Sequence, residues 1–206
     1  MAATQTTQPK KKPFSSFSYR DAFKQLNLTQ LAAWQSDMFP VPASGFFQEH
    51  MQRLQCFDLS SSEESKKLII DAILAEAIQT FKHLKIWKGA ALESDIATGE
   101  ADYLISEHKA YLEAPFVCIV EAKRDDFYQG LAQCLVEMQA CQWNNQQLGK
   151  TFDSFGIVTN GEGWKFYKLS TDIAAYETPL YSISNLDSVL GWLHYIFQHC
   201  EQNLNQ

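Results

Sequence analysis

Apolar residues recur every three to four positions in three long segments of the chain, which predicts a helix in each. The first begins at residues 60–64, where serines precede glutamates in two overlapping capping boxes, and it continues to about Ile78. The second runs from Gly130 to about Gln147, and the third covers about residues 184–202. An apolar stripe of this kind is typical of a helix that packs against a core.

Shorter apolar runs, rich in β-branched and aromatic residues, lie between these helices and predict strands. They cover residues 81–88, 101–108, 116–123, 155–159 and 164–169. Asn160-Gly161 between the last two runs is a hairpin-type turn signal. The order is helix, three strands, helix, two strands and helix, which predicts an α/β fold around a mixed sheet that is partly antiparallel.

The N-terminal part of the chain has a different character. Residues 1–12 end in three lysines and lack an apolar segment followed by a cleavage site, so we expect a disordered tail and no secretory signal. Residues 13–60 are rich in aromatics and glutamine, with a helix expected at about 19–35 and a break at Pro40 and Pro42. This segment is interpreted as a helical extension that packs on one globular unit, residues 61–206.

Composition narrows the functional classes. The net charge of −7 argues against a protein that coats nucleic acid by charge alone. No apolar run approaches the roughly 20 residues of a membrane helix, so no membrane partner is expected. The five cysteines form no C-x-x-C pair, which favours reduced thiols in a cytoplasmic protein and argues against disulfides or structural zinc.

The third predicted strand ends in Glu121-Ala122-Lys123, directly after a β-branched apolar run. Glu121 and Lys123 therefore project from the same face of the strand, and Ala122 points the other way. If residues 101–108 and 116–123 form a hairpin, the numbers of opposed residues should sum to about 223, which places Asp102 across from Glu121. Two carboxylates and an ammonium at one end of a sheet are typical of a site for a hard cation such as Mg²⁺.

Helical residues provide further candidates. Glu76 interrupts the apolar face of the first helix, and a carboxylate in that position needs a partner. Gln133 and Glu137 lie one turn apart on the flank of the apolar stripe of the second long helix, so they could border the same site.

These residues together resemble the PD-(D/E)XK nuclease superfamily, which has the restriction-endonuclease-like fold. The matching features are residues 99–103 (GEADY), residues 120–124 (VEAKR), Gly130-x-x-Gln133 on the following helix, and the helix acid Glu76. The resemblance covers about residues 60–169. Ala101 stands where the superfamily name has proline. Within the superfamily the chain looks like small stand-alone bacterial proteins, often cyanobacterial, of unassigned role.

The resemblance implies an αβββαβ core and a Mg²⁺-dependent nuclease, with Mn²⁺ as a possible substitute and DNA as the expected substrate. By position, Asp102, Glu121 and the Ala122 carbonyl would bind the metal, and Lys123 would position or activate the attacking water. Glu76 would hold a second metal or a metal-bound water, and Gln133 would orient Lys123 or the water. The implied reaction is phosphodiester hydrolysis. A small endonuclease that cuts both strands often acts as a homodimer.

Other interpretations compete with this one. Glu121 and Lys123 alone would be a surface ion pair, Glu76 could pair with Lys82 or Lys85, and Glu137 is expected to be a solvated helix residue. A non-catalytic module that binds nucleic acid or protein could use the same fold. Acid/base catalysis on a sugar would use two acids but would give Lys123 no role.

Arg124, Lys85 and Lys88 are candidate phosphate contacts, and Asp125 and Asp126 are expected to supply negative charge before the helix that contains Gly130.

Overall fold

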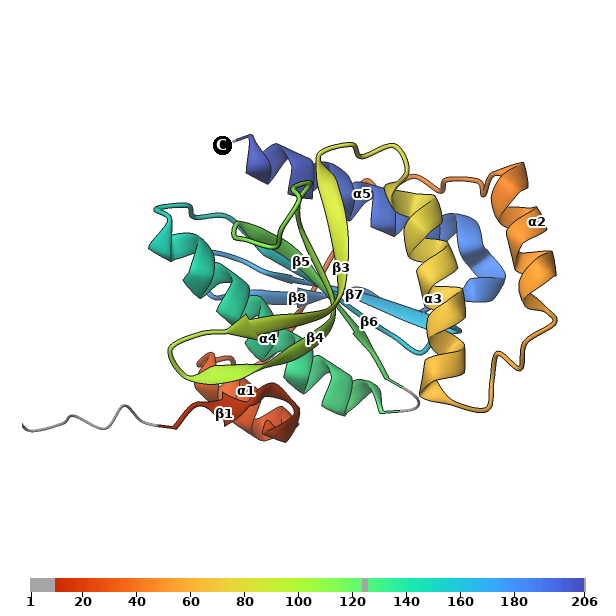
Figure 1. The fold of residues 1–206 in the computed structure, drawn as a ribbon. Coiled ribbons are helices and arrows are strands. Elements are labelled where there is room, and N and C mark those ends of the chain that lie inside the picture. Colours follow the sequence, from red (N-terminus) through yellow and green to blue (C-terminus); the bar gives the residue numbers. More distant parts are fainter. Residues whose placement is uncertain (1–9, 124–125, 206) are drawn as a thin grey trace, which may run out of the picture.

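In the computed structural model, which describes residues 10–123 and 126–205, helices cover both faces of a mixed β-sheet (Figure 1). The strands are β1 (Lys12–Pro13), β2 (Ala32–Ala33), β3 (Leu84–Glu93), β4 (Ala97–Glu107), β5 (Phe116–Ala122), β6 (Ser154–Thr159), β7 (Gly163–Leu169), β8 (Ala175–Glu177) and β9 (Tyr181–Ser182). The helices are α1 (Tyr19–Gln25), α2 (Gly45–Leu54), α3 (Glu63–Ile78), α4 (Phe127–Gln147) and α5 (Leu186–Leu204). The prediction of an α/β architecture with a mixed sheet is confirmed.

The strands predicted from apolar runs form the middle of the sheet. β4 pairs antiparallel with β5, β5 pairs parallel with β6, and β6 pairs antiparallel with β7. Every residue of β5 and β6 is buried, as expected for strands that are covered on both faces. Antiparallel pairs therefore flank the parallel pair β5–β6 on both sides, and β3, β8 and β9 add further antiparallel pairs.

Each face of the sheet has its own hydrophobic core. α4 and α1 cover one face, and α3 and α5 cover the other (Figure 1). Ile119 of β5 belongs to the core beneath α4, together with Leu135, whereas Val120 belongs to the core beneath α3 and α5, together with Ile73 and Leu193. Alternation along β5 therefore directs its next residue, Glu121, towards α4.

The hairpin of β4 and β5 has the register expected from the sequence. Tyr103 lies opposite Val120 and Ile105 lies opposite Cys118, so each pair sums to 223. A bulge beside Ser106 shifts only the pair closest to the turn. Pairing with β5 stops at Tyr103, while β4 continues alongside β3. The register thus places Asp102, the residue before Tyr103 in β4, at the end of β5.

Asn160 and Gly161 form the turn between β6 and β7, as their sequence indicated. The connection contains three residues, 160–162, and the Asn160 side chain accepts a hydrogen bond of 2.7 Å from the Gly163 amide. Gly161 has a φ of +85°, which a residue with a side chain rarely adopts. This hairpin brings Thr159 beside the end of β5.

The N-terminal segment, residues 13–60, wraps around the sheet. β1 extends the sheet next to β4, and β2 extends it next to β8. α1 packs on α4, and α2 packs on α3. Lys11 and Lys12, which were expected in the disordered tail, instead form ion pairs with Glu93 at 2.9 Å and Asp21 at 3.2 Å. The rest of the expected tail, residues 1–9, lies outside the described residues.

Two helices of this segment differ from the prediction. The helix expected over residues 19–35 ends at Gln25, because Asn27 adopts a left-handed φ of +55° that terminates it. α2 was not predicted at all. Phe47, Met51 and Leu54 follow helical spacing in it, but the segment is only ten residues long, and its start depends on Ser44, which caps it through the Phe47 amide at 3.1 Å.

In the described part of the chain, no helix has both the length and the hydropathy that crossing a membrane requires.

Candidate active site at the end of strand β5

Five polar residues from three elements converge where β5 ends, and we call them the carboxylate cluster. Asp102 comes from β4, Glu121 from β5, Lys123 from the residues just after β5, and Gln133 and Glu137 from α4. Glu121 and Glu137 are completely buried, and Gln133 is 6% exposed. Four of these five residues were predicted to form a site, and Glu137 was considered only as a residue that could border it.

Asp102 lies just beyond the last backbone pair between β4 and β5. Its Oδ2 accepts a hydrogen bond of 2.9 Å from the Ala122 amide, so the side chain continues the link between β4 and β5. Its Oδ1 accepts a hydrogen bond of 3.0 Å from the ammonium of Lys67 on α3. The carboxylate is therefore fixed on both oxygens, by a strand on one side and a helix on the other.

Glu121 and Lys123 lie close enough to form an ion pair, as two side chains expected on the same face of a strand end can do. Lys123 Nζ lies 2.6 Å from Glu121 Oε1. The backbone of Lys123 is held separately, because its amide donates a hydrogen bond of 2.8 Å to the Thr159 carbonyl of β6. Unlike a surface ion pair, this one contains a carboxylate with no exposure and an ammonium on a side chain that is 23% exposed.

Glu137 is not the solvated residue that was expected. Its Oε1 accepts a hydrogen bond of 2.9 Å from Gln133 Nε2, and both side chains lie against the sheet. Helix α4 is buried over most of its length, so the flank of its apolar stripe is also covered. Gln133 therefore does not serve as a backbone cap, and its amide is oriented by a second acid.

The cluster contains more buried acceptors than donors. Within the described residues, Gln133 Oε1, Glu137 Oε2 and Glu121 Oε2 find no hydrogen-bond donor. Glu121 Oε1 likewise accepts no well-aligned hydrogen bond, although the Lys123 ammonium is close to it. Buried oxygens without a donor are unfavourable and require a proton, a water molecule or a cation.

The pKa values of the acids reflect this environment. Burial raises the pKa of Glu121 to about 8, and the charge of Asp102 acts in the same direction. Burial also raises the pKa of Glu137, and the charge of Glu121 raises it further. Burial alone would lower the pKa of Lys123, but its close contact with the Glu121 carboxylate outweighs burial, so this pKa rises as well. Near neutral pH the cluster therefore retains protons that the same groups would lose in water.

The oxygen atoms of the cluster are of the chemical type that binds a hard divalent cation. Carboxylate and carbonyl oxygens are the usual ligands of Mg²⁺, which keeps several of its waters and needs few protein ligands. Over residues 10–123 and 126–205, however, no three Asp, Glu, His or Cys side chains already converge in the geometry of a metal site. The orphaned oxygens of Glu121 and Glu137 are the observation that favours a cation here.

Glu76, predicted as a metal ligand, lies elsewhere. Its carboxylate accepts hydrogen bonds from the Ser44 amide at 2.6 Å and the Ser44 hydroxyl at 3.0 Å, so it anchors the start of α2. Nine residues separate Glu76 from Lys67, which is about 14 Å along a helix. Glu76 therefore has the hydrogen-bond partner that a carboxylate among apolar residues needs, but this partner is Ser44 and not Lys82 or Lys85. Near the cluster, α3 instead contributes Glu63, whose charge helps to raise the pKa of Glu121.

Gly130 allows α4 to approach the cluster closely. A Cβ atom at this position would lie 2.7 Å from Val158 Cγ1 and 3.0 Å from Lys123 Cγ. The helix begins at Asp126, whose side chain accepts a hydrogen bond of 2.9 Å from the Gln129 amide. Asp126 thus supplies the expected negative charge at the helix start, while Asp125 and Arg124 lie outside the described residues.

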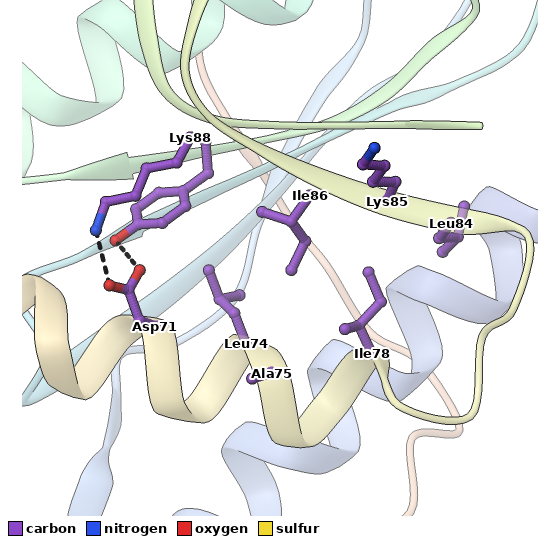
Figure 2. Close-up of a pocket in the computed structure, with 9 residues that line it drawn as sticks. Asp71, Leu74, Ala75, Ile78, Leu84, Lys85, Ile86 and Lys88 are labelled. Atoms are coloured by element: carbon purple, nitrogen blue, oxygen red, sulfur yellow. Dashed lines mark hydrogen bonds and ion pairs between the residues drawn. The ribbon is translucent and has the colours of Figure 1, made fainter. Parts of the chain in front are cut away.

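A groove with a volume of about 370 Å³ lies between α3 and β3 (Figure 2), and Tyr103, the neighbour of Asp102 in β4, is one of its lining residues. Its walls are mostly apolar, and Asp71 of α3 binds both the Tyr103 hydroxyl at 2.8 Å and the Lys88 ammonium at 2.7 Å. Lys85, the other candidate phosphate contact on β3, donates to the Lys109 carbonyl at 3.0 Å. Both lysines therefore have partners within the protein, and their contact with phosphate remains a prediction.

Comparison with known proteins gives limited information. No family model matches the chain. A segment of 56 residues, 27% of the chain, is 46% identical to Crinkler effector protein 5 of Phytophthora infestans. The matched segment spans 15% of the length of that protein, so the similarity is local and shows no family membership.

Proposed function

We propose that this protein is a Mg²⁺-dependent nuclease with the restriction-endonuclease-like fold and that it hydrolyses phosphodiester bonds in DNA. The observation that carries the proposal is the carboxylate cluster, where buried acids and an ammonium meet at the end of a central strand. A protein that only needed stability would gain little from such a group, because desolvating the charges costs about as much as pairing them returns.

In this proposal Asp102 and Glu121 hold the cation, together with the Ala122 carbonyl, and Mn²⁺ can replace Mg²⁺. A bound divalent cation lowers the pKa of water and stabilises the negative charge that develops on the phosphate. Since Asp102 is anchored to the Ala122 amide, the two acids are held in fixed relation to each other. Such preorganisation is what a site for in-line displacement requires.

The other cluster residues act around this pair. The Lys123 ammonium, partly exposed beside Glu121, would position the attacking water and offset charge on the phosphate. Gln133 donates its amide hydrogen to Glu137, which leaves its oxygen free to accept a hydrogen bond from the water or from Lys123. Glu137 is therefore assigned as a positioning residue for Gln133.

Cleavage of a supercoiled plasmid tests the proposal. We expect nicking or degradation with Mg²⁺ or Mn²⁺, none with EDTA, and loss of cleavage in Lys123→Ala. Lys165→Ala is the matched control. Lys165 of β7 has a side chain about as exposed as that of Lys123, and it pairs with Glu177 of β8 at 2.5 Å. Circular dichroism should show that both variants are folded. Absence of metal-dependent cleavage, or equal cleavage by Lys123→Ala and the wild type, would contradict the proposal.

One observation favours a non-catalytic binding module instead. Asp102 and Glu121 are each already paired with a lysine, so these acids have partners without a metal. A binding module would shift DNA or a protein ligand in a gel or sedimentation assay but would leave the plasmid intact at all metal concentrations. Sedimentation of the free protein would also test the proposed homodimer.

A further inference from the structure

Lys67 is the cationic partner of a predicted metal ligand, and it comes from outside the sequence motif. It lies on α3, and its ammonium is 3.0 Å from Asp102 Oδ1. Both side chains are mostly buried, with exposures of 16% for Lys67 and 20% for Asp102. Burial would lower the pKa of Lys67, but the hydrogen bond and charge of Asp102 raise it overall, so this residue remains an ammonium ion.

This contact conflicts with metal binding at the same atom. Asp102 Oδ2 is already committed to the Ala122 amide, and Oδ1 to Lys67. An ammonium and a divalent cation are unfavourable partners of the same oxygen, because like charges a few ångströms apart repel, and they repel more strongly at a partly buried site than in water. Lys67 must therefore leave Oδ1 before that oxygen can bind a divalent cation.

We propose that Lys67 is a built-in competitor of the divalent cation, so that this residue sets the cation concentration at which the site fills. The inference rests on the proposed function, because it assumes that Asp102 is a metal ligand. It assigns Lys67 a regulatory role that the nuclease motif does not contain: the site remains closed by its own ammonium until the free cation concentration is high enough.

The structure also provides a second position for the displaced ammonium. Glu64 lies one helical turn before Lys67, and its Oε2 is 3.7 Å from Lys67 Nζ. The Glu64 side chain is 79% exposed, so this pair is weak and open to water. Lys67 can thus move from a buried acid to an exposed one through a change of its side-chain rotamer, without a change in α3.

The affinity for Mn²⁺, measured by electron paramagnetic resonance of the free ion at fixed pH, tests this inference without an activity assay. Lys67→Met keeps the aliphatic length but removes the charge, and its Kd for Mn²⁺ should fall about tenfold relative to the wild type. Lys67→Arg retains a cation beside Asp102 and should bind Mn²⁺ no more tightly than the wild type. Glu64→Gln should raise the Kd about twofold, because the displaced ammonium loses its second partner.

Lys88→Met is the matched control. Lys88 pairs with Asp71 of the same helix, α3, at 2.7 Å, and Figure 2 shows this pair at one edge of the groove. Its removal should leave the Kd for Mn²⁺ unchanged. Thermal unfolding provides a second measurement: in EDTA Lys67→Met should unfold at a lower temperature than the wild type, and saturating Mn²⁺ should raise its Tm by more.

The outcomes separate this inference from the proposed function. If the wild type binds Mn²⁺ and cleaves DNA but Lys67→Met has an unchanged or higher Kd, Lys67 is only structural and the inference is wrong, while the nuclease proposal stands. If neither protein binds Mn²⁺ and neither cleaves DNA, both proposals fail. If Lys88→Met tightens binding as much as Lys67→Met, the effect is one of general charge, and the inference is again wrong.

Discussion

Raising the pH should destabilise this protein when no divalent cation is present, because Glu121 is buried where its charged form is unfavourable. The pKa of Glu121 is about 8 in the folded protein, compared with 4.5 in an unfolded chain. Between these two values the folded protein retains a proton that the unfolded chain releases. The unfolded state therefore gains stability relative to the folded state as the pH rises through this range.

The magnitude follows from the difference of about 3.5 units between 8 and 4.5. Each unit corresponds to about 1.4 kcal/mol, so the free energy of unfolding should fall by up to about 5 kcal/mol from pH 4.5 to pH 8. The value is an upper limit, because local opening of the cluster to water reduces the penalty. It is nevertheless a large part of the 5 to 15 kcal/mol that is typical of a folded domain.

Urea denaturation in EDTA at pH 5, 6, 7 and 8 measures this dependence. We expect the free energy of unfolding of the wild type to decline steadily, and Glu121→Gln to show a clearly smaller decline because the titrating group is gone. Some decline should persist in the variant, because burial also raises the pKa of Glu137. Glu177→Gln, which removes an acid from a surface pair, should follow the wild type.

Equal slopes for the wild type and Glu121→Gln would refute this reasoning, because they would mean that Glu121 is ionised in the folded protein. A wild-type stability that rises between pH 5 and 8 would refute it as well. Measurements stop at pH 8 so that Lys123 remains an ammonium ion throughout.

Two further substitutions separate structural residues from site residues. Gly130→Ala should lower stability by about 1 to 2 kcal/mol in urea denaturation and reduce cleavage. The new methyl group collides with Val158 and Lys123, and this outweighs the better helix propensity of alanine. The control is Gly45→Ala, where the new Cβ has no non-local neighbour within 4 Å, and it should be neutral or stabilising. Glu76→Ala should lower stability by about 1 to 2 kcal/mol, because it leaves the partly buried amide and hydroxyl of Ser44 at the start of α2 unpaired, but metal-dependent cleavage should persist below the new Tm. Loss of cleavage at full stability would restore Glu76 to the site.

The strand pairing was predictable because the two apolar runs follow each other closely in the chain, which favours a hairpin between them. The hairpin gives opposed residues whose numbers sum to about 223, as the structure shows, although β5 is buried on both faces and its apolar pattern alone would not exclude a shift by one residue. The convergence of Asp102 with Glu121 follows from that register and needs no knowledge of any other contact.

The partners of the helical acids were not predictable in this way. The position of Glu76 showed that it needed a partner, but its partner Ser44 is 32 residues away and caps a helix that was not predicted. Glu137 was misjudged for a related reason: whether the flank of an amphipathic helix is solvated depends on what covers it. Here α4 is buried almost all around by the sheet and the N-terminal segment. Such contacts depend on tertiary packing, which the local pattern does not encode.

Charge balance connects the pH dependence to the proposed role of Lys67. Asp102, Glu121 and Glu137 carry three negative charges when ionised, and Lys67 and Lys123 carry two positive ones, so the group has an excess of one negative charge. A retained proton offsets this excess, and this effect adds to burial, which is the main cause of the raised pKa of Glu121. When a divalent cation replaces the proton and Lys67 moves to Glu64, the three acids, Lys123 and the cation sum to zero, so the filled site no longer repels the negative charge of a phosphodiester. Proton release, displacement of Lys67 and binding of the cation would then be linked steps of one equilibrium.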